Sequence, residues 1–140
     1  MIEGWYGDDY LVLFEERATA LDQAYGLSAA VPGYRLVGLR SWDDFIVEDS
    51  TGARFTVPTV PLVHEHLAPF TAPKGPARPD PDAKVQGRIK WYIKPIVFGG
   101  DPKSGDNVTW ITLEQHVQLV AWWNKMYHDV KEGRGATPAA

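Results

Sequence analysis

The stretch from residue 89 to residue 127 constrains the fold more than any other part of the chain. It holds four of the six tryptophans, and large aromatic side chains each bury roughly 150–250 Å² in a core. Its first six residues alternate between the two faces of a strand, which predicts a strand with one buried face. Thr112 and Gln115 have the spacing of a capping box, so we expect a long helix to begin at Leu113 and to end near His128.

Several other segments have the periodicity of regular structure. The clearest is a hairpin, because two alternating runs at residues 44–48 and 54–57 flank the turn sequence Asp49-Ser50-Thr51-Gly52. Apolar spacing predicts an amphipathic helix over residues 15–25, which Gly26 would end. Further strands are expected at residues 10–14, 34–40 and 108–111, and one or two helical turns at residues 62–70.

These elements predict a single α+β domain. We expect a mostly antiparallel sheet with one short helix and one longer C-terminal helix packed on it. The domain would span residues 1–130, and residues 131–140 would form a flexible tail. Residues 71–87 hold four prolines and very few apolar side chains, so they are expected to form an exposed connecting loop.

The composition excludes several classes of protein. The chain has no cysteine, which rules out disulfide frameworks, thiolate metal sites and cysteine nucleophiles. No apolar run approaches the ~18 residues that a membrane span needs, and no signal peptide is recognisable. We therefore expect a cytoplasmic protein that does not interact with membranes.

The net charge of −4 is unevenly distributed along the chain. Residues 1–50 hold ten acidic and three basic side chains, a balance of −7, whereas residues 51–140 hold eight acidic and eleven basic ones, a balance of +3. An acidic surface repels phosphates, so the first part of the chain is not expected to bind nucleic acid. It suits a basic protein partner, although a solvated face that maintains solubility explains the same charges equally well.

Histidines are candidates for catalysis or metal binding. His64 and His66 would share a face of a strand and could bind zinc, but no third ligand follows at a suggestive spacing. A surface turn is therefore the favoured interpretation, and we expect no metal and no cofactor. His116 lies beside the apolar stripe of the last helix, so a hydrogen-bonded structural role is favoured over that of a catalytic base.

The sequence Trp42-Asp43-Asp44-Phe45 places paired acids beside aromatic residues. Two neighbouring carboxylates suit acid–base chemistry. However, adjacent residues of a strand point to opposite faces, which argues against a catalytic pair. An exposed tryptophan next to acidic residues is a common composition of binding anchors, so we interpret this segment as an interaction surface.

With these elements placed, residues 10–60 resemble the SUKH superfamily, which contains bacterial toxin-immunity proteins and fungal cell-wall synthesis regulators. The resemblance is a pattern of apolar positions and turns without a catalytic signature. Where members of the family usually begin with a helix, this chain begins with a glycine-rich turn at residues 3–7. The segments that carry the resemblance are Tyr10-Leu11-Val12-Leu13-Phe14, Ala24-Tyr25-Gly26-Leu27, Val31-Pro32-Gly33-Tyr34, Leu36-Val37-Gly38, Asp44-Phe45-Ile46-Val47, residues 55–58, and, nearer the C-terminus, Phe98-Gly99-Gly100-Asp101-Pro102 and Trp122-Trp123-Asn124.

The resemblance implies a non-catalytic immunity protein, a monomer or homodimer, that binds and neutralises a cognate toxin, with a basic nuclease-like domain as the natural counterpart of the acidic region. A regulatory or scaffolding module of the same fold is the first alternative. A small hydrolase that uses His116 or the pair His64 and His66 is the second. The residues expected to contact the partner are Trp5, Asp8, Asp9, Trp42, Asp43 and Asp44.

Overall fold

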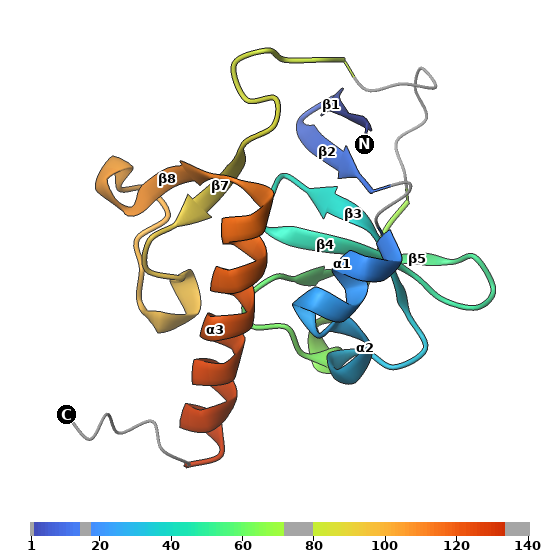
Figure 1. Ribbon diagram of the computed structural model, residues 1–140, viewed down its shortest axis with the longest axis vertical. Coiled ribbons are helices and arrows are strands. Elements are labelled where there is room, and N and C mark those ends of the chain that lie inside the picture. The colour runs from blue at the N-terminus through green and yellow to red at the C-terminus, as the bar shows by residue number, and fades with distance from the viewer. Residues whose placement is uncertain (1, 15–17, 72–79, 134–140) are drawn as a thin grey trace.

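The computed structural model describes residues 2–14, 18–71 and 80–133. Six strands form one antiparallel sheet, in which strands that are neighbours in the sequence are also neighbours in space (Figure 1). A second, two-stranded antiparallel sheet stands beside it. The strands are β1 (Ile2–Tyr6), β2 (Asp9–Leu13), β3 (Arg35–Arg40), β4 (Asp44–Glu48), β5 (Arg54–Pro58) and β6 (Ala68–Pro69) in the large sheet, and β7 (Ile89–Tyr92) and β8 (Val108–Ile111) in the small one.

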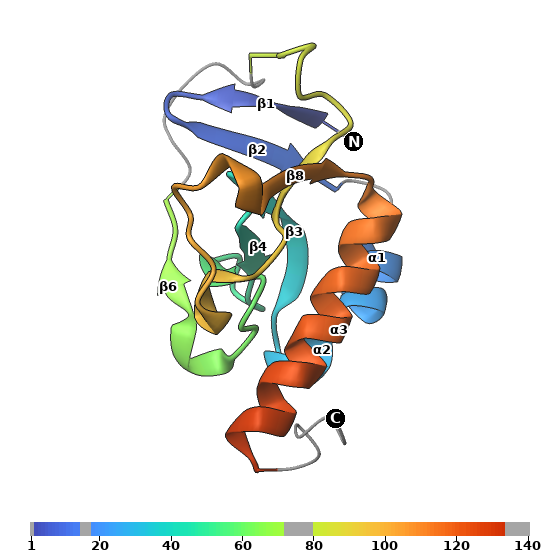
Figure 2. The ribbon, with the colours of Figure 1, turned by 90° about the vertical axis from the view of Figure 1, so that its left-hand side faces the viewer.

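The described ranges also contain three α-helices, which together with the strands confirm the predicted α+β class. The long C-terminal helix lies between the β7–β8 pair and the first helix, and it contacts both (Figures 1 and 2). None of the helices in the described ranges has the length and apolar character of a membrane-spanning segment. The helices are α1 (Ala18–Tyr25), α2 (Leu27–Ala30) and α3 (Leu113–Lys131), with single 3-10 turns at η1 (His64–His66), η2 (Ile96–Phe98) and η3 (Gly105–Asn107).

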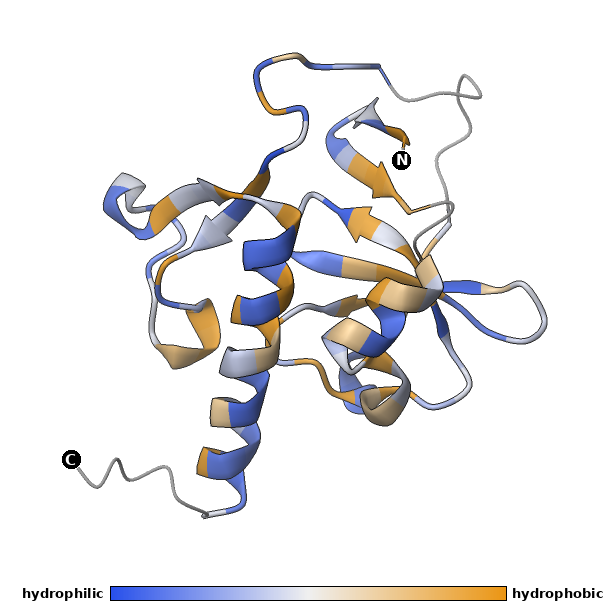
Figure 3. Ribbon diagram, in the orientation of Figure 1, coloured by the Kyte–Doolittle hydropathy of each residue, from blue (hydrophilic) through white to orange (hydrophobic). Residues whose placement is uncertain are grey.

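The main core lies where the helices cover the large sheet. Tyr10 and Phe45 from the sheet, Tyr25 from α1, Trp91 from β7 and Val120 from α3 belong to one buried cluster. Apolar and hydrophilic residues alternate along α3 (Figure 3), and the residues that the helix buries are His116, Val120 and Asn124. Burial of one stripe of each helix is what holds helices of this length in place, because short helices are marginal on their own.

The hairpin predicted from its turn sequence is present. β4 and β5 pair over five positions, from Asp44 opposite Pro58 to Glu48 opposite Arg54. The expected polar face of β4 is wrong at one position, because Ile46 is as deeply buried as its neighbours. Ile46 lies outside the main buried cluster that holds Phe45 and Val47, so both faces of β4 are covered at these positions.

The N-terminal segment is a strand and not the expected glycine-rich turn. β1 pairs with β2 from Ile2 opposite Leu13 to Tyr6 opposite Asp9, so that Gly7 and Asp8 form a two-residue loop. Gly7 has a φ of 60°, which tight hairpin loops require and which glycine adopts at little cost.

The predicted start of α3 at its capping box and the predicted end of α1 at Gly26 are both confirmed. The Thr112 side chain accepts a hydrogen bond from the backbone N–H of Gln115, and the Gln115 side chain accepts one from the backbone N–H of Thr112. Gly26 ends α1 in the left-handed conformation, with a φ of 74°. The first residues of the helix predicted over 15–25 lie outside the described ranges, as do residues 134–140 of the expected tail. α3 continues to Lys131, three residues beyond the expected end.

The proline-rich segment is attached to the sheet at its C-terminal end. Residues 80–87 are mostly exposed, as expected for a connecting loop. Nevertheless, Asp80 and Trp5 exchange two backbone hydrogen bonds of 2.8 and 2.9 Å, and the backbone N–H of Gly87 donates to Glu3. These bonds cover part of the free edge of β1, which would otherwise be open to pairing with another chain. Residues 72–79 lie outside the described ranges.

Asn124 clamps the segment that follows β5 against α3. Its side-chain NH₂ donates to the carbonyl of Thr59 at 2.8 Å, and its carbonyl oxygen accepts from the backbone N–H of Leu62 at 2.7 Å. Asn124→Ala would leave both buried backbone groups without these partners, so we expect a loss of about 2 kcal/mol in the free energy of unfolding. Urea denaturation measures it, with the exposed Gln118→Ala as control on the same helix. Equal stability of the two variants would contradict the clamp.

Candidate functional site

Four carboxylates that the sequence singled out lie at one end of the large sheet. Asp8 and Asp9 belong to the β1–β2 loop and the start of β2, whereas Asp43 and Asp44 belong to the β3–β4 turn and the start of β4. β2 and β3 are antiparallel neighbours, so both turns emerge at the same end. The Ser41 hydroxyl lies 3.4 Å from Asp9 and links the two turns. We call the set Asp8, Asp9, Asp43 and Asp44 the acidic surface.

Trp42 does not extend from this surface. Its side chain is only 7% exposed, so the expectation of an exposed tryptophan anchor is wrong. Ser41 and Trp42 both have positive φ values, of 47° and 63°, and such a left-handed turn is uncommon without glycine. At this turn the Trp42 indole points inward, where it stacks on Tyr10 at 4.7 Å and packs edge-on against Trp110 at 5.1 Å. The ring therefore supports the acidic surface from below.

Trp5 has a similar supporting position. Its ring packs edge-on against Tyr10 at 5.2 Å and against Trp42 at 6.0 Å. Its indole N–H donates to the carboxylate of Asp82 at 3.1 Å, which holds the end of the proline-rich segment against β1. Both tryptophans predicted as partner contacts thus belong to one aromatic cluster beneath the acids.

Asp43 and Asp44 have different cationic partners. Lys90 of β7 donates to Asp43 at 3.2 Å, and Arg40 of β3 donates to Asp44 at 3.0 Å. The Tyr92 hydroxyl also lies 3.5 Å from Asp43. Desolvation by burial raises the pKa of both carboxyl groups above the ordinary aspartate value, and the cations only partly counteract this effect. The two ionised carboxylates are therefore only partly compensated by their neighbours.

A small pocket opens where these two aspartates meet the β7–β8 sheet. It has a volume of about 220 Å³. Pro58 and Val60 line it from the end of β5, while Trp91 and Ile96 are among the lining residues from the β7 side. We call this cavity the carboxylate pocket, with Asp43, Asp44, Pro58, Thr59, Val60, Trp91, Tyr92, Pro95 and Ile96 as its lining residues. It combines mostly apolar walls with two acidic groups.

The chain beyond β7 exposes apolar side chains next to the pocket. Ile93 is 54% exposed and Ile96 is 51% exposed, and Val97 also lies open to solvent. Isolated exposed apolar residues are normal on a protein surface. Three within five positions, one of them in the wall of a pocket, form a patch of the kind found at protein interfaces.

The structure confirms the hydrogen-bonded role predicted for His116. The ring is fully buried, with Nδ1 2.6 Å from the Tyr25 hydroxyl and Trp91 packed edge-on at 5.5 Å. Burial lowers the pKa of His116 to about 3, so the ring is neutral at physiological pH. With no exposed surface, His116 cannot contact a substrate in this conformation.

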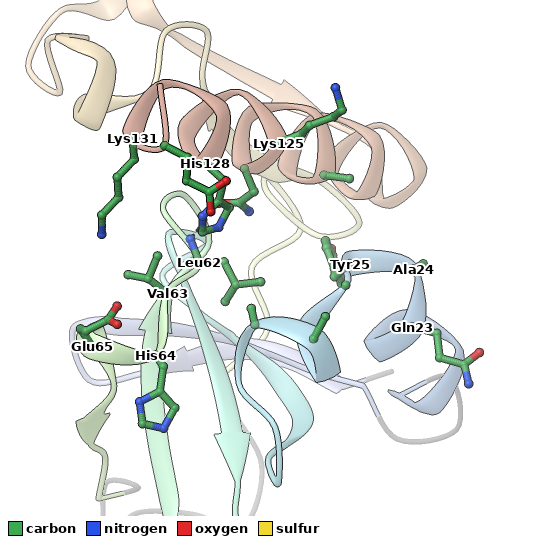
Figure 4. A pocket seen from close by; sticks show the side chains of 16 residues that line it. Gln23, Ala24, Tyr25, Leu62, Val63, His64, Glu65, Lys125, His128 and Lys131 are labelled. Carbon is green, nitrogen blue, oxygen red and sulfur yellow. Dashed lines mark hydrogen bonds between the residues drawn. The ribbon is translucent and has the colours of Figure 1, made fainter. Parts of the chain in front are cut away.

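His64 and His66 lie on η1, in the exposed turn that the sequence favoured. His64 borders an open groove of about 760 Å³ between α1, η1 and the end of α3. Figure 4 shows His128 and Lys131 of α3 on one side of this groove and His64 and Glu65 on the other, with the Lys125 ammonium directed away. Within the described ranges, no three His, Asp or Glu side chains are grouped closely enough to hold a metal ion.

The sequence interpretation missed the contribution of β7 to the site. Lys90 and Tyr92 reach Asp43 across 47 and 49 residues of sequence. Alternation along residues 89–94 does indicate that Lys90 and Tyr92 share a face. It contains no information on which distant segment that face meets, because the pairing of the small sheet with the β3–β4 turn depends on the tertiary fold.

Comparisons with protein-family models, with curated proteins and with solved structures found no match to this chain. The assignment to the SUKH superfamily therefore remains a prediction from sequence resemblance.

Proposed function

We propose that this protein is a non-catalytic immunity protein that binds and neutralises a toxin domain with a basic surface. The observation that carries the proposal is the acidic surface, in which two turns separated by more than thirty residues bring Asp8 and Asp9 next to Asp43 and Asp44. Among the described residues, Arg40 pairs with Asp44 and Lys90 pairs with Asp43, so the four acids and these two bases sum to a local charge of −2.

The surroundings of the acidic surface support a protein partner over a small charged ligand. Interfaces combine an apolar centre with a polar rim, and charge complementarity increases the association rate and excludes wrong partners. Here, the exposed Ile96 lines the same pocket as Asp43 and Asp44, and the exposed Ile93 precedes it by three residues. A basic partner could thus bury apolar surface and neutralise carboxylates at the same time.

Co-expression with the neighbouring gene tests this proposal. An immunity gene is expected directly beside the gene of its toxin, so we expect that gene to be toxic alone and harmless together with this protein. Asp43→Asn/Asp44→Asn keeps the side-chain shapes and removes two charges, and we expect it to lose protection. Removal of charges that are desolvated in a complex weakens binding by about 2–5 kcal/mol.

Glu65→Gln/Asp106→Asn provides the matched control, because it removes two exposed carboxylates that belong neither to the acidic surface nor to the lining of the carboxylate pocket. It should protect as well as the unmodified protein. A non-toxic neighbouring gene product, or one that remains toxic in the presence of this protein, would contradict the function. Full protection by a folded Asp43→Asn/Asp44→Asn variant would contradict the position of the interface.

A further inference from the structure

The carboxylate pocket has the size and wall composition to hold one long side chain. Its volume of about 220 Å³ exceeds that of a single large residue and falls short of the roughly 300–1,000 Å³ of small-molecule sites. Pro58 and Pro95 contribute apolar lining, and the aromatic residues of the lining are Tyr92 and the largely buried Trp91. These walls would contact an aliphatic stem or a planar group at a small entropic cost to the protein.

The charge of the pocket selects the head group of that side chain. Among the described residues, both charged side chains that line the pocket are acidic, namely Asp43 and Asp44. Their partners Lys90 and Arg40 approach from other strands, β7 and β3, and do not fill the cavity. An anionic group would be repelled by the two carboxylates of the pocket. A purely apolar group would remove water from these carboxylates without compensating their charge.

A guanidinium group fits this combination better than an ammonium group. It is planar, presents five N–H donors in a fixed arrangement and stacks on aromatic rings. It is also more weakly hydrated than an ammonium group, so that its transfer into a pocket with apolar walls costs less. An additional cation would compensate the partly buried charges of Asp43 and Asp44, whose pKa values are raised by desolvation.

We propose that the carboxylate pocket is a binding site for the arginine side chain of a partner protein, with Asp43 and Asp44 as acceptors of its guanidinium group. The proposal rests on the proposed function for the existence of a basic partner, and it identifies the residue through which that partner would be anchored. Buried arginines at the centre of an interface are frequent hot spots.

The isolated side chain tests the site without any partner protein. We expect N-acetyl-argininamide to shift the indole N–H signal of Trp91 and the methyl signals of Ile96 in an NMR titration, with a dissociation constant on the order of millimolar. N-acetyl-citrullinamide has nearly the same shape and no charge. It should bind at least tenfold more weakly, and equal binding of the two compounds would overturn the proposal.

Two double variants distinguish binding in the carboxylate pocket from nonspecific electrostatic attraction. Asp43→Asn/Asp44→Asn should weaken binding of N-acetyl-argininamide at least tenfold, whereas Glu65→Gln/Asp106→Asn should leave it unchanged. Equal weakening of binding by both variants would overturn the site. So would the absence of any shift of the Trp91 and Ile96 signals of the unmodified protein at 50 mM N-acetyl-argininamide, a concentration well above roughly millimolar affinities. The citrulline comparison uses the unmodified protein and remains valid if a variant does not fold.

The two proposals fail in different ways. Absence of argininamide binding together with loss of protection in the Asp43→Asn/Asp44→Asn variant would reject the arginine site and retain the immunity function. Specific argininamide binding together with a harmless neighbouring gene would retain the site and reject the toxin as its partner.

Discussion

Acidification from pH 7 to pH 4.5 is expected to reduce the free energy of unfolding by about 2.5 kcal/mol through His116 alone. Burial lowers the pKa of this ring from its ordinary value of 6.5 to about 3. Between these two values the unfolded chain binds a proton at His116 and the folded chain does not. Stability therefore decreases as the pH falls through this window, by about 1.4 kcal/mol per pH unit well below pH 6.5.

The geometry around His116 explains why the folded state excludes the proton. The ring has no exposed surface, Tyr25 occupies Nδ1, and Nε2 has no hydrogen-bond partner within the described part of the chain. Burial also raises the pKa of Tyr25, so the hydroxyl stays neutral and offers no charge to stabilise an imidazolium. A protonated ring would be a buried cation without a counter-charge, which is strongly unfavourable.

Other groups contribute to the pH profile, and a variant isolates His116. Asp43 and Asp44 act in the opposite direction, because their raised pKa values favour proton uptake by the folded state. His116→Gln retains a hydrogen-bonding side chain and does not titrate. Urea denaturation at pH 7 and pH 4.5 should show a much smaller pH effect in this variant than in the unmodified protein.

Equal pH effects in the two proteins would contradict this assignment. If His116→Gln does not fold, NMR of the unmodified protein gives the same information. The imidazole C–H signals of His116 should then remain at their neutral positions from pH 7 down to pH 4.5. Titration of these signals near the ordinary histidine pKa would contradict the prediction.

The elements that the sequence predicted well depend on local signals. The β4–β5 hairpin, the start of α3 at its capping box and the end of α1 at Gly26 are each determined by residues within a few positions of the boundary. Turn chemistry and capping act over such distances, so the sequence contains the information directly. β1 had a local signal as well, since Gly7-Asp8 is a suitable two-residue hairpin loop, but the glycines on either side of Trp5 suggested a longer turn.

The features that the sequence did not predict depend on contacts between distant segments. Adjacent acids and aromatics in residues 42–45 identified the region of the candidate site. Whether Trp42 points to solvent depends on a left-handed turn and on the space between Tyr10 and Trp110. The carboxylate pocket needs both the β3–β4 turn and the β7 region, which are more than forty residues apart. Periodicity shows which residues share a face but not which other segment that face contacts.

Replacement of Gly38 by alanine is expected to destabilise the protein by about 3 kcal/mol or more. Gly38 lies in β3, where the strand crosses an irregularity in its pairing with β4, and it is paired with Leu13 of β2 on the other side. A methyl group at this position would overlap the carbonyl oxygen of Val12 and lie 3.1 Å from the Cα of Leu13. Both obstacles are backbone atoms of a paired strand, so relief requires the strands to separate, and over-packing of this kind is costly.

The same close approach of β2 and β3 positions the acidic surface, because it places Asp9 beside Ser41 at the end of the two strands. Separation of the strands at Gly38 should therefore reduce both stability and partner binding. Gly105→Ala is the matched control, since a methyl group there meets no atom within 4 Å and its φ is not positive. Urea denaturation of the two variants compares them directly. A midpoint for Gly38→Ala equal to that of Gly105→Ala would show that β2 and β3 can separate at little cost, and that their spacing does not fix the geometry of the acidic surface.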